Sequence, residues 1–231
     1  MKYAGVIPAK GSSTRLPNKN MYQIQGVPLF LWAANNLNRV LDRKDIFIDS
    51  DSDEILLLAE KHGFGAIKRP EALATNATNG NELMLWEMSQ VDADVYIQHL
   101  PPMIFLKQST LQKGIEMIES GYDSVFSVLK TQCYLWGETA PKYDLYNLPN
   151  SFTLPPTIIE GMGLYFTKRN ILEQTKVRVA GNYSMLEIDK FEAIDIDYLE
   201  DMELATAVAN GLPSENPYTS GIQKLRSDII E

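Results

Sequence analysis

Hydrophobic and polar positions follow two periods that alternate along most of the chain. Short apolar runs of strand length are separated by segments whose apolar residues recur at helical spacing, as do Ile55, Leu58 and Ala59. The strand-like segments are 3–8, 45–49, 65–68, 94–98, 124–129, 163–166 and 193–197. Repeated strand–helix units of this length predict an α/β fold, in which a largely parallel sheet carries helices on both faces.

Several residues predict where the helices begin and end. Pro28 suits the first turn of the first helix. Ser50 with Asp53 predicts the N-cap of the second helix, and Ser109 with Gln112 predicts a similar capping box later in the chain. Gly63 can end the second helix in a left-handed turn. Further helices are expected over 80–91 and from the end of the last strand to residue 211.

Residues 130–160 interrupt this pattern. They show little periodicity but are rich in aromatic side chains, namely Tyr134, Trp136, Tyr143, Tyr146 and Phe152. Such a segment is either a loop packed on its own core or an arm that packs on another subunit. The residues after Pro213 are expected to form a polar tail. We expect one domain over residues 1–231, with 130–160 as an insertion.

Composition narrows the class of protein. The single cysteine, Cys133, allows no intrachain disulfide, and a cytoplasmic location is expected. A net charge of −9 argues against a nucleic-acid partner, and no apolar stretch is long enough to span a membrane. We also expect no signal peptide. With only His62 and His99, a site of several histidines around zinc is not expected.

The loop after the first strand, residues 9–20, is the first candidate site. Its cations and hydroxyl residues include Lys10, Ser12, Ser13, Arg15 and Lys19. Ligands of open α/β sheets bind at the carboxyl ends of strands, where backbone amides and cations can surround a phosphate group. The loop has neither the Walker nor the Rossmann glycine spacing. It therefore indicates an anion without identifying it, and a solvated connection is the alternative interpretation.

The second candidate site is a pair of acids in the last predicted strand. Ile194 and Ile196 alternate with Asp195 and Asp197, so the two carboxylates share one face, with their residues roughly 6.5–7 Å apart. Such carboxylates repel each other unless a cation lies beside them, and Mg²⁺ binds a few protein oxygens together with substrate phosphates. The alternative is that Asp197 caps the following helix with Glu200 in the third position.

Four segments together resemble the acylneuraminate cytidylyltransferase family, the CMP-sialic acid synthetases and their relatives. They are IPAKGSSTRLPNKN (7–20), IDSDSDEILLLAEKHG (48–63), KRPEALAT (68–75) and FEAIDIDYLEDMELA (191–205). The resemblance implies a Rossmann-like three-layer fold with a mainly parallel sheet. It also implies a homodimer with a protruding arm after the fifth strand. The implied reaction transfers CMP from CTP to the hydroxyl of a sugar acid similar to a nonulosonic acid, with release of pyrophosphate.

The resemblance also implies roles for individual residues. Lys10, Arg15 and Lys19 would hold the leaving pyrophosphate, with Ser12 and Ser13 in the same loop. Asn20 and Arg69 would hold the cytidine, although Arg69 after a strand can also close a turn. Asp195 and Asp197 would bind Mg²⁺, the one cofactor expected. Lys107 and Lys113 could meet a carboxylate of the acceptor. The catalytic set is therefore Lys10, Arg15, Lys19 and Asp197.

The acceptor half of the chain departs from the family pattern. Where relatives carry Gln-Pro-Thr-Ser-Pro-Leu-Arg, this chain has the more apolar segment 101–107, and segments 150–153 and 161–163 differ as well. These differences indicate either a new acceptor or a nucleotide-binding homologue without activity. A further alternative is a nucleoside-diphosphate-sugar pyrophosphorylase that acts on a sugar 1-phosphate.

Overall fold

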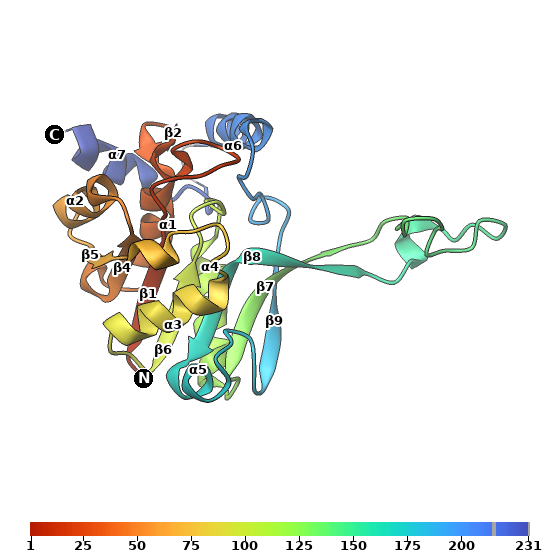
Figure 1. Cartoon of the computed structure of the whole chain (residues 1–231). Helices are drawn as coiled ribbons and strands as arrows, with labels where there is room; N and C mark the ends of the chain where they lie inside the picture. Colours follow the sequence, from red (N-terminus) through yellow and green to blue (C-terminus); the bar gives the residue numbers. More distant parts are fainter. Residues whose placement is uncertain (214–215, 231) are drawn as a thin grey trace.

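A central sheet organises the computed structural model, which describes residues 1–213 and 216–230. Within those residues seven strands form the sheet, in the order β5-β4-β1-β6-β8-β7-β9 (Figure 1). Their bounds are Tyr3–Pro8 (β1), Ile46–Ser50 (β4), Gly65–Lys68 (β5), Val95–His99 (β6), Ser124–Thr131 (β7), Thr157–Lys168 (β8) and Tyr183–Ile188 (β9). A separate small hairpin joins β2 (Gln23–Ile24) to β3 (Val27–Pro28).

The sheet is mostly parallel. β1 pairs in parallel with β4 and β6, β4 pairs in parallel with β5, and β7 pairs in parallel with β9. β8 runs antiparallel to both of its neighbours, β6 and β7. The prediction of an α/β fold with a mainly parallel sheet is confirmed. The carboxyl ends of β1, β4, β5 and β6 consequently meet at one edge.

Helices cover both faces of the sheet, which gives the expected three layers. The α-helices are Leu29–Asn38 (α1), Asp53–Lys61 (α2), Gly80–Gln90 (α3), Gln108–Glu119 (α4), Arg169–Thr175 (α5), Leu199–Gly211 (α6) and Ile222–Ile230 (α7). Short 3₁₀ turns occur at Lys19–Met21, Arg43–Asp45, Glu71–Leu73 and Ser151–Thr153. One buried apolar cluster joins α1, α2, α4, α6 and α7 to the sheet, and a second joins α3 and α5 to the other face. No described helix is long and apolar enough to cross a membrane.

Alternation within β1 explains how one strand serves both clusters. Ala4 and Val6 are buried with the helices of the second cluster, while Ile7 is buried in the first. Gly5 lies on the α1 side, where a Cβ would come within 2.7 Å of a methyl group of Leu37. The glycine therefore lets α1 approach the sheet closely.

Several predicted elements were wrong in detail. Residues 193–197 form an extended loop instead of a strand. The N-cap of α2 is Ser52, whose Oγ accepts a hydrogen bond from the backbone N–H of Ile55, while Ser50 lies at the end of β4. Ser109 does not cap α4, because that helix already begins at Gln108.

Among the described strands and α-helices, β2, β3, β9, α5 and α7 were missed from the sequence. The predicted polar tail includes α7, whose Ile222 and Leu225 are buried against the rest of the chain. Residues 214, 215 and 231 of that tail lie outside the described part. The end of the chain is thus packed on the domain by an amphipathic helix.

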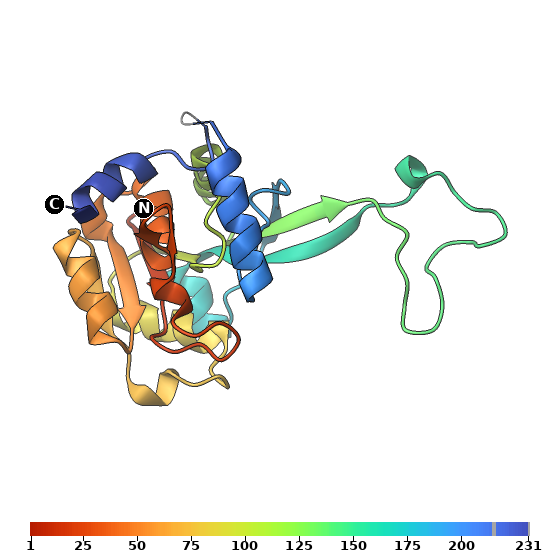
Figure 2. The same cartoon turned by 90° about the horizontal axis from the view of Figure 1, so that it is seen from above.

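The segment 130–160 forms an arm that projects from the domain (Figures 1 and 2). β7 and β8 remain paired as far as Thr131 and Thr157 and carry the arm away from the sheet. The rings of Tyr134 and Trp136 pack on Tyr143, but many apolar side chains of the arm face solvent. Tyr146 is fully exposed and Phe152 is 71% exposed. The arm therefore has little core of its own.

Candidate active site

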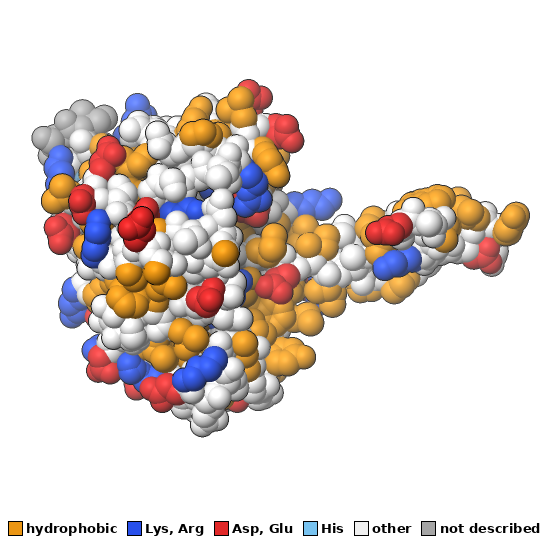
Figure 3. Space-filling model, in the orientation of Figure 1, with side chains coloured by type: hydrophobic (Ala, Val, Ile, Leu, Met, Phe, Trp, Pro, Cys, Tyr) orange, Lys and Arg blue, Asp and Glu red, His pale blue; other side chains and the backbone are white. Residues whose placement is uncertain are grey.

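A pocket of about 470 Å³ lies at the carboxyl edge of β1, β5 and β6. Its volume is within the range of small-molecule sites. The lining combines the loop after β1, the segment after β5 and the turn after β6, that is, Pro8, Lys10, Ser12, Ser13, Thr14, Arg15, Lys19, Asn20, Arg69, Leu73, Thr75, Asn76, Thr78, Leu83, Leu100, Pro101 and Pro102. Figure 3 shows Lys and Arg side chains inside a hollow of this face. The structure therefore brings the predicted loop residues and Arg69 together.

Charge distinguishes this pocket from the rest of an acidic chain. Among the described residues that line it, four side chains are cationic and none is a carboxylate. Lys10, Arg15 and Lys19 come from the loop after β1, and Arg69 follows β5. A concave site with this charge can bind a polyphosphate even though the whole protein is negative.

Hydrogen bonds hold the loop after β1 in place. The backbone N–H of Gly11 donates to Oδ1 of Asp51 over 2.8 Å, and Nδ2 of the buried Asn20 donates to the carbonyl of Lys10 over 2.8 Å. Gly11 also lies so close to Ser52 that a Cβ would come within 2.8 Å of the Cβ of Ser52. The loop is thus anchored to the segment that follows β4.

Arg69 reaches the pocket from a buried ion pair. Its Nη2 and Nε donate to Oδ2 of Asp49 over 2.7 and 3.0 Å, and Nη2 also donates to the carbonyl of Asp49. Burial raises the pKa of Asp49, and the hydrogen bonds from Arg69 oppose that shift. Nη1 of Arg69 has no hydrogen bond within the described residues and remains a donor for a ligand.

Asp195 and Asp197 lie beside the loop after β1, on the segment that leads into α6. Asp197 accepts from Nη1 of Arg15 over 2.5 Å and from Nζ of Lys19 over 2.9 Å. Asp195 forms no hydrogen bond or ion pair with any described residue. Burial raises the pKa of Asp195, and the charge of Asp197 adds to the shift. The charges of the two acids thus act on each other, but the residues do not lie on a strand, so the shared strand face predicted for them is absent.

The alternative role of Asp197 as a helix cap does not fit the geometry. The N-cap of α6 is Tyr198. Oδ2 of Asp201 accepts from the backbone N–H groups of Asp197 and Tyr198 over 3.0 and 2.8 Å. Asp201 therefore caps this helix start, and the carboxylate of Asp197 is left for other contacts.

The donor set of these acids fits Mg²⁺ that is shared with a substrate. Within residues 1–213 and 216–230 no group of three or more His, Cys, Asp or Glu is placed to hold a metal. The described residues provide two carboxylates for a metal ion here, those of Asp195 and Asp197. Asp195 forms no ion pair with a described cation. Mg²⁺ commonly binds one or two carboxylates and completes its shell with water and phosphate oxygens.

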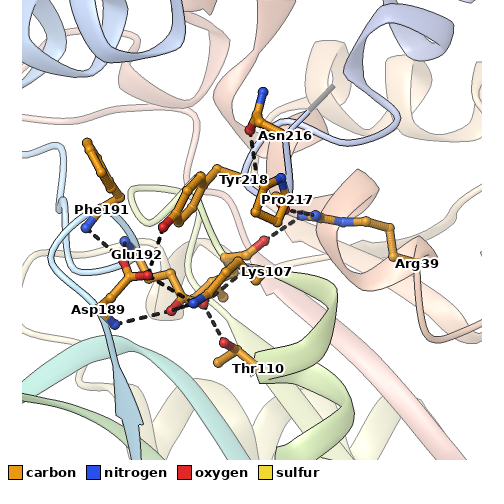
Figure 4. Close-up of polar contacts among 10 residues, drawn as sticks. Arg39, Lys107, Thr110, Asp189, Phe191, Glu192, Asn216, Pro217 and Tyr218 are labelled. Carbon is orange, nitrogen blue, oxygen red and sulfur yellow. Dashed lines mark hydrogen bonds and ion pairs between the residues drawn. The ribbon is translucent and has the colours of Figure 1, made fainter. Parts of the chain in front are cut away.

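Lys107 lies outside the pocket, in a polar cluster at the start of α4 (Figure 4). Its Nζ lies 2.9 Å from Oδ2 of Asp189 and 3.3 Å from Oε2 of Glu192. The buried Glu192 also accepts from the backbone N–H of Lys107 and from the hydroxyl of Thr110. Tyr218 donates its hydroxyl to Asp189, which joins the cluster to the segment before α7. The contact of Lys107 with an acceptor remains a prediction.

The apolar residues that depart from the family pattern do not face the pocket. Met103, Ile104, Phe105 and Leu106 are fully buried in the main core, and only Pro101 and Pro102 line the pocket. The departure at 101–107 thus changes core packing. It gives no reason to expect an apolar acceptor or a loss of activity.

The sequence interpretation missed one wall of the pocket. Thr75, Asn76 and Thr78 line it from the segment between β5 and α3. Oδ1 of Asn76 accepts from Nζ of Lys10 over 2.6 Å, so this segment sets the position of a predicted catalytic side chain. The signal that could have revealed it is the run of Thr and Asn residues at 75–79, between β5 and α3.

The fold and this pocket define a nucleotide-binding type of α/β protein, with a cationic loop after the first strand and paired acids beside it. A family model described as Cytidylyltransferase matches residues 4–140. The chain belongs to the cytidylyltransferase family.

The individual relatives share about a quarter to a third of their aligned residues with this chain. N-acylneuraminate cytidylyltransferase A of Danio rerio is 26% identical over 209 residues, which cover 84% of this chain and 47% of that protein. The 3-deoxy-manno-octulosonate cytidylyltransferase of Acidobacterium capsulatum is 32% identical over 93 residues, which cover 40% of this chain and 36% of that protein. The chain thus spans about half or less of the length of these curated relatives.

The fold has matches among solved structures. A CMP:2-keto-3-deoxy-manno-octonic acid synthetase in complex with CTP has a TM-score of 0.68 at 15% identity. The similarity covers 92% of this chain and 100% of that one. It supports the Rossmann-like architecture predicted for the chain.

Proposed function

We propose that this protein transfers CMP from CTP to a hydroxyl group of a sugar acid similar to a nonulosonic acid. The observation that carries the proposal is the pocket at the sheet edge, with four cations and no carboxylate in its described lining. Family membership supports CTP as the donor. The relatives named as N-acylneuraminate and 3-deoxy-manno-octulosonate cytidylyltransferases support a sugar acid as the acceptor.

The reaction needs positioning and charge stabilisation more than covalent catalysis. The acceptor oxygen forms a bond to the α-phosphorus, the bond from that phosphorus to the bridging oxygen breaks, and pyrophosphate leaves with the bridging oxygen. The hydroxyl proton passes to solvent. Lys10, Arg15 and Lys19 would neutralise the charge that develops on the leaving group. Asn20 and Arg69 would hold the cytidine, with Ser12 and Ser13 beside the phosphates.

Asp195 and Asp197 would hold Mg²⁺. When bound, the ion would polarise the phosphate group that is attacked. The protein's own part is to keep one carboxylate free of cationic partners and the second within reach of Arg15 and Lys19.

The test is a transfer assay with the purified protein. CTP, ATP, GTP and UTP are each combined with Mg²⁺ and with N-acetylneuraminic acid, 3-deoxy-manno-octulosonic acid or a sugar 1-phosphate. Pyrophosphate release and the nucleotide-sugar product are measured. Product from CTP and a sugar acid supports the proposal. Turnover only with a sugar 1-phosphate would assign the protein to the pyrophosphorylases, and CTP binding without product from any acceptor would indicate an inactive homologue.

We further propose that the protein is a homodimer that forms through the arm. The support is the exposed apolar surface of the arm, including Leu148, Tyr146 and Phe152, since such patches mark contacts with other chains. Light scattering would measure the mass of the wild type and of a Tyr146→Asp, Phe152→Asp double variant. The control is Leu57→Asp, which places a charge at an exposed apolar position of α2. A wild-type monomer would contradict this proposal.

A further inference from the structure

A second depression adjoins the nucleotide pocket at the start of α3. This groove has a volume of about 400 Å³ and is lined by Asn79, Gly80, Asn81, Glu160, Val177, Arg178 and Val179. Thr78 lines the pocket and the next residue, Asn79, lines the groove, so the two linings are contiguous in the chain at the N-terminal end of α3. The site described above uses none of these groove residues.

Arg178 is the cation of the groove, and its side chain is firmly held. Its backbone N–H donates to Oδ1 of Asn81 over 3.0 Å, and Nη1 donates to Oε1 of Gln98 over 2.9 Å. The guanidinium carbon lies 3.6 Å from the ring centroid of Tyr165. Gly80 provides the space, because a Cβ there would clash with the guanidinium. An arginine fixed on three sides loses little further entropy on binding a ligand.

Part of this guanidinium remains available. Arg178 forms no ion pair within the described residues, and its Nε and Nη2 make no hydrogen bond there. Glu160 also lines the groove, but Oε1 of that carboxylate accepts from the hydroxyl of Tyr165 over 2.5 Å. The free donors of an arginine match a planar carboxylate in two parallel hydrogen bonds.

Buried polar residues lie between Arg178 and the nucleotide pocket. Nε2 of Gln98 donates to Oε2 of Glu87 over 2.7 Å, and both side chains are fully buried. Burial and the nearby charge of Asp49 raise the pKa of Glu87, which favours the uncharged acid. Asp49 in turn binds Arg69. Arg69 of the pocket and Arg178 of the groove thus lie on either side of the same buried residues.

We propose that the Arg178 groove binds the carboxylate of the sugar acceptor while the adjoining pocket holds CTP. This inference rests on the proposed function and deepens it. Lys107, which the sequence suggested for this role, already lies against Asp189 and Glu192 and is outside both depressions. Arg178 is a cation beside the pocket that forms no ion pair with a described residue.

The first experiment is a kinetic comparison of the wild type with Arg178→Gln and Arg178→Lys. The acceptors are N-acetylneuraminic acid and its methyl ester, and 3-deoxy-manno-octulosonic acid and its methyl ester. In Arg178→Gln the KM for each acid is expected to rise roughly 10- to 100-fold, as the loss of a hydrogen-bonded charge predicts. The KM for each ester and for CTP should stay near the wild-type values, and Arg178→Lys should fall between the two for the acids.

The matched control is Lys176→Asn. It removes the same charge from the same loop at an exposed position with φ of 61°, which asparagine tolerates, and Lys176 does not line the groove. Its KM values should equal those of the wild type. Thermal melting of each variant separates loss of binding from loss of fold, and Arg178→Lys keeps the test valid if Arg178→Gln unfolds.

The second experiment measures binding without turnover. Saturation-transfer NMR would follow both sugar acids with the protein alone and with α,β-methylene CTP. Binding by the wild type that is lost in Arg178→Gln supports the groove. Equal binding by wild type and variant, or no binding of either acid by the wild type, overturns it. If the wild type transfers CMP from CTP but the acceptor KM is unchanged in Arg178→Gln, the role of the groove is rejected. The proposed function is then retained. Failure to bind CTP would instead reject the proposed function.

Discussion

Asp49 and Arg69 form a buried ion pair directly beneath the nucleotide pocket. Both Nε and Nη2 of Arg69 donate to the same oxygen of Asp49, and the two side chains are 3% and 0% exposed. A buried pair contributes little net stability, but removing one partner leaves an uncompensated charge. The pair therefore orients Arg69 toward the pocket. The folded protein then needs Asp49, because its carboxylate compensates the buried charge of Arg69.

The first prediction follows from that requirement. Asp49→Ala should lower the free energy of unfolding by about 3–5 kcal/mol, because the guanidinium of Arg69 stays buried without its partner. The double variant Asp49→Ala, Arg69→Met should recover much of the loss, since neither charge remains. Urea denaturation of both variants and the wild type measures the difference. A double variant no more stable than Asp49→Ala would contradict this explanation.

The second prediction separates a metal-binding acid from a helix cap. Asp197→Asn should reduce kcat/KM roughly 100-fold or more, as expected when charge stabilisation is removed from a transition state. Its unfolding free energy should change by less than about 1 kcal/mol, because the pair with Arg15 is partly exposed and asparagine keeps an oxygen that can accept from the less exposed Lys19. Activity is measured over a range of Mg²⁺ concentrations, and stability is measured by urea denaturation.

Asp201→Ala is the matched control for that experiment. It removes the acceptor of two backbone N–H groups at the start of α6 and should cost about 1 kcal/mol of stability. Its dependence on Mg²⁺ should stay that of the wild type. If Asp197→Asn lost stability and Asp201→Ala did not, Asp197 would be the structural residue and the metal site would be rejected.

The sequence predicted much of the first half of the fold, because the signals there are local. Short apolar runs and helical spacing depend only on residues that are close together in the sequence. The same holds for Gly63, whose φ of 77° ends α2. The site at the carboxyl ends of the strands follows from the parallel order itself. For the same reason the cations of the loop after β1 could be placed together before the structure was known.

The wrong and missed strands occur where the hydrophobic pattern does not determine which strand a segment pairs with. Within 193–197 only Ile196 is buried, and Ile194 is half-buried like Asp195 and Asp197. No described strand pairs with this segment, so the alternation in the sequence did not correspond to a two-sided strand. β9 was missed because Tyr183 and Met185 are apolar residues on an exposed face, which hides its alternation. Long-range contacts decide both cases, and local periodicity does not contain them.

The third prediction concerns the cations of the pocket. Lys10→Ala should weaken CTP binding about tenfold, because it removes a charge-assisted contact to phosphate. Titration calorimetry with CTP and Mg²⁺ measures the affinity. Lys68→Ala is the control, since Lys68 pairs with Asp53 and does not line the pocket. Equal affinities for Lys10→Ala and the wild type would remove Lys10 from the phosphate site.

The fourth prediction is a dependence of stability on pH that His99 causes. This side chain is fully buried. Nδ1 lies 3.2 Å from the carbonyl of Gly163, and Nε2 lies 3.1 Å from the amide nitrogen of Asn36. Burial lowers the pKa of His99 from 6.5 to about 4. Between these values the unfolded chain binds a proton that the folded chain does not, so stability falls as the pH drops from 6.5 to 4.

The gap between the two pKa values corresponds to about 3 kcal/mol, which is the expected contribution of His99 to the loss. Glu87 acts in the opposite direction, since its raised pKa favours the fold at low pH. The measured quantity is therefore the difference between wild type and His99→Gln in urea denaturation at a series of pH values. The variant should lose stability less steeply than the wild type between pH 6.5 and 4, and parallel curves would show that His99 is already protonated in the folded protein.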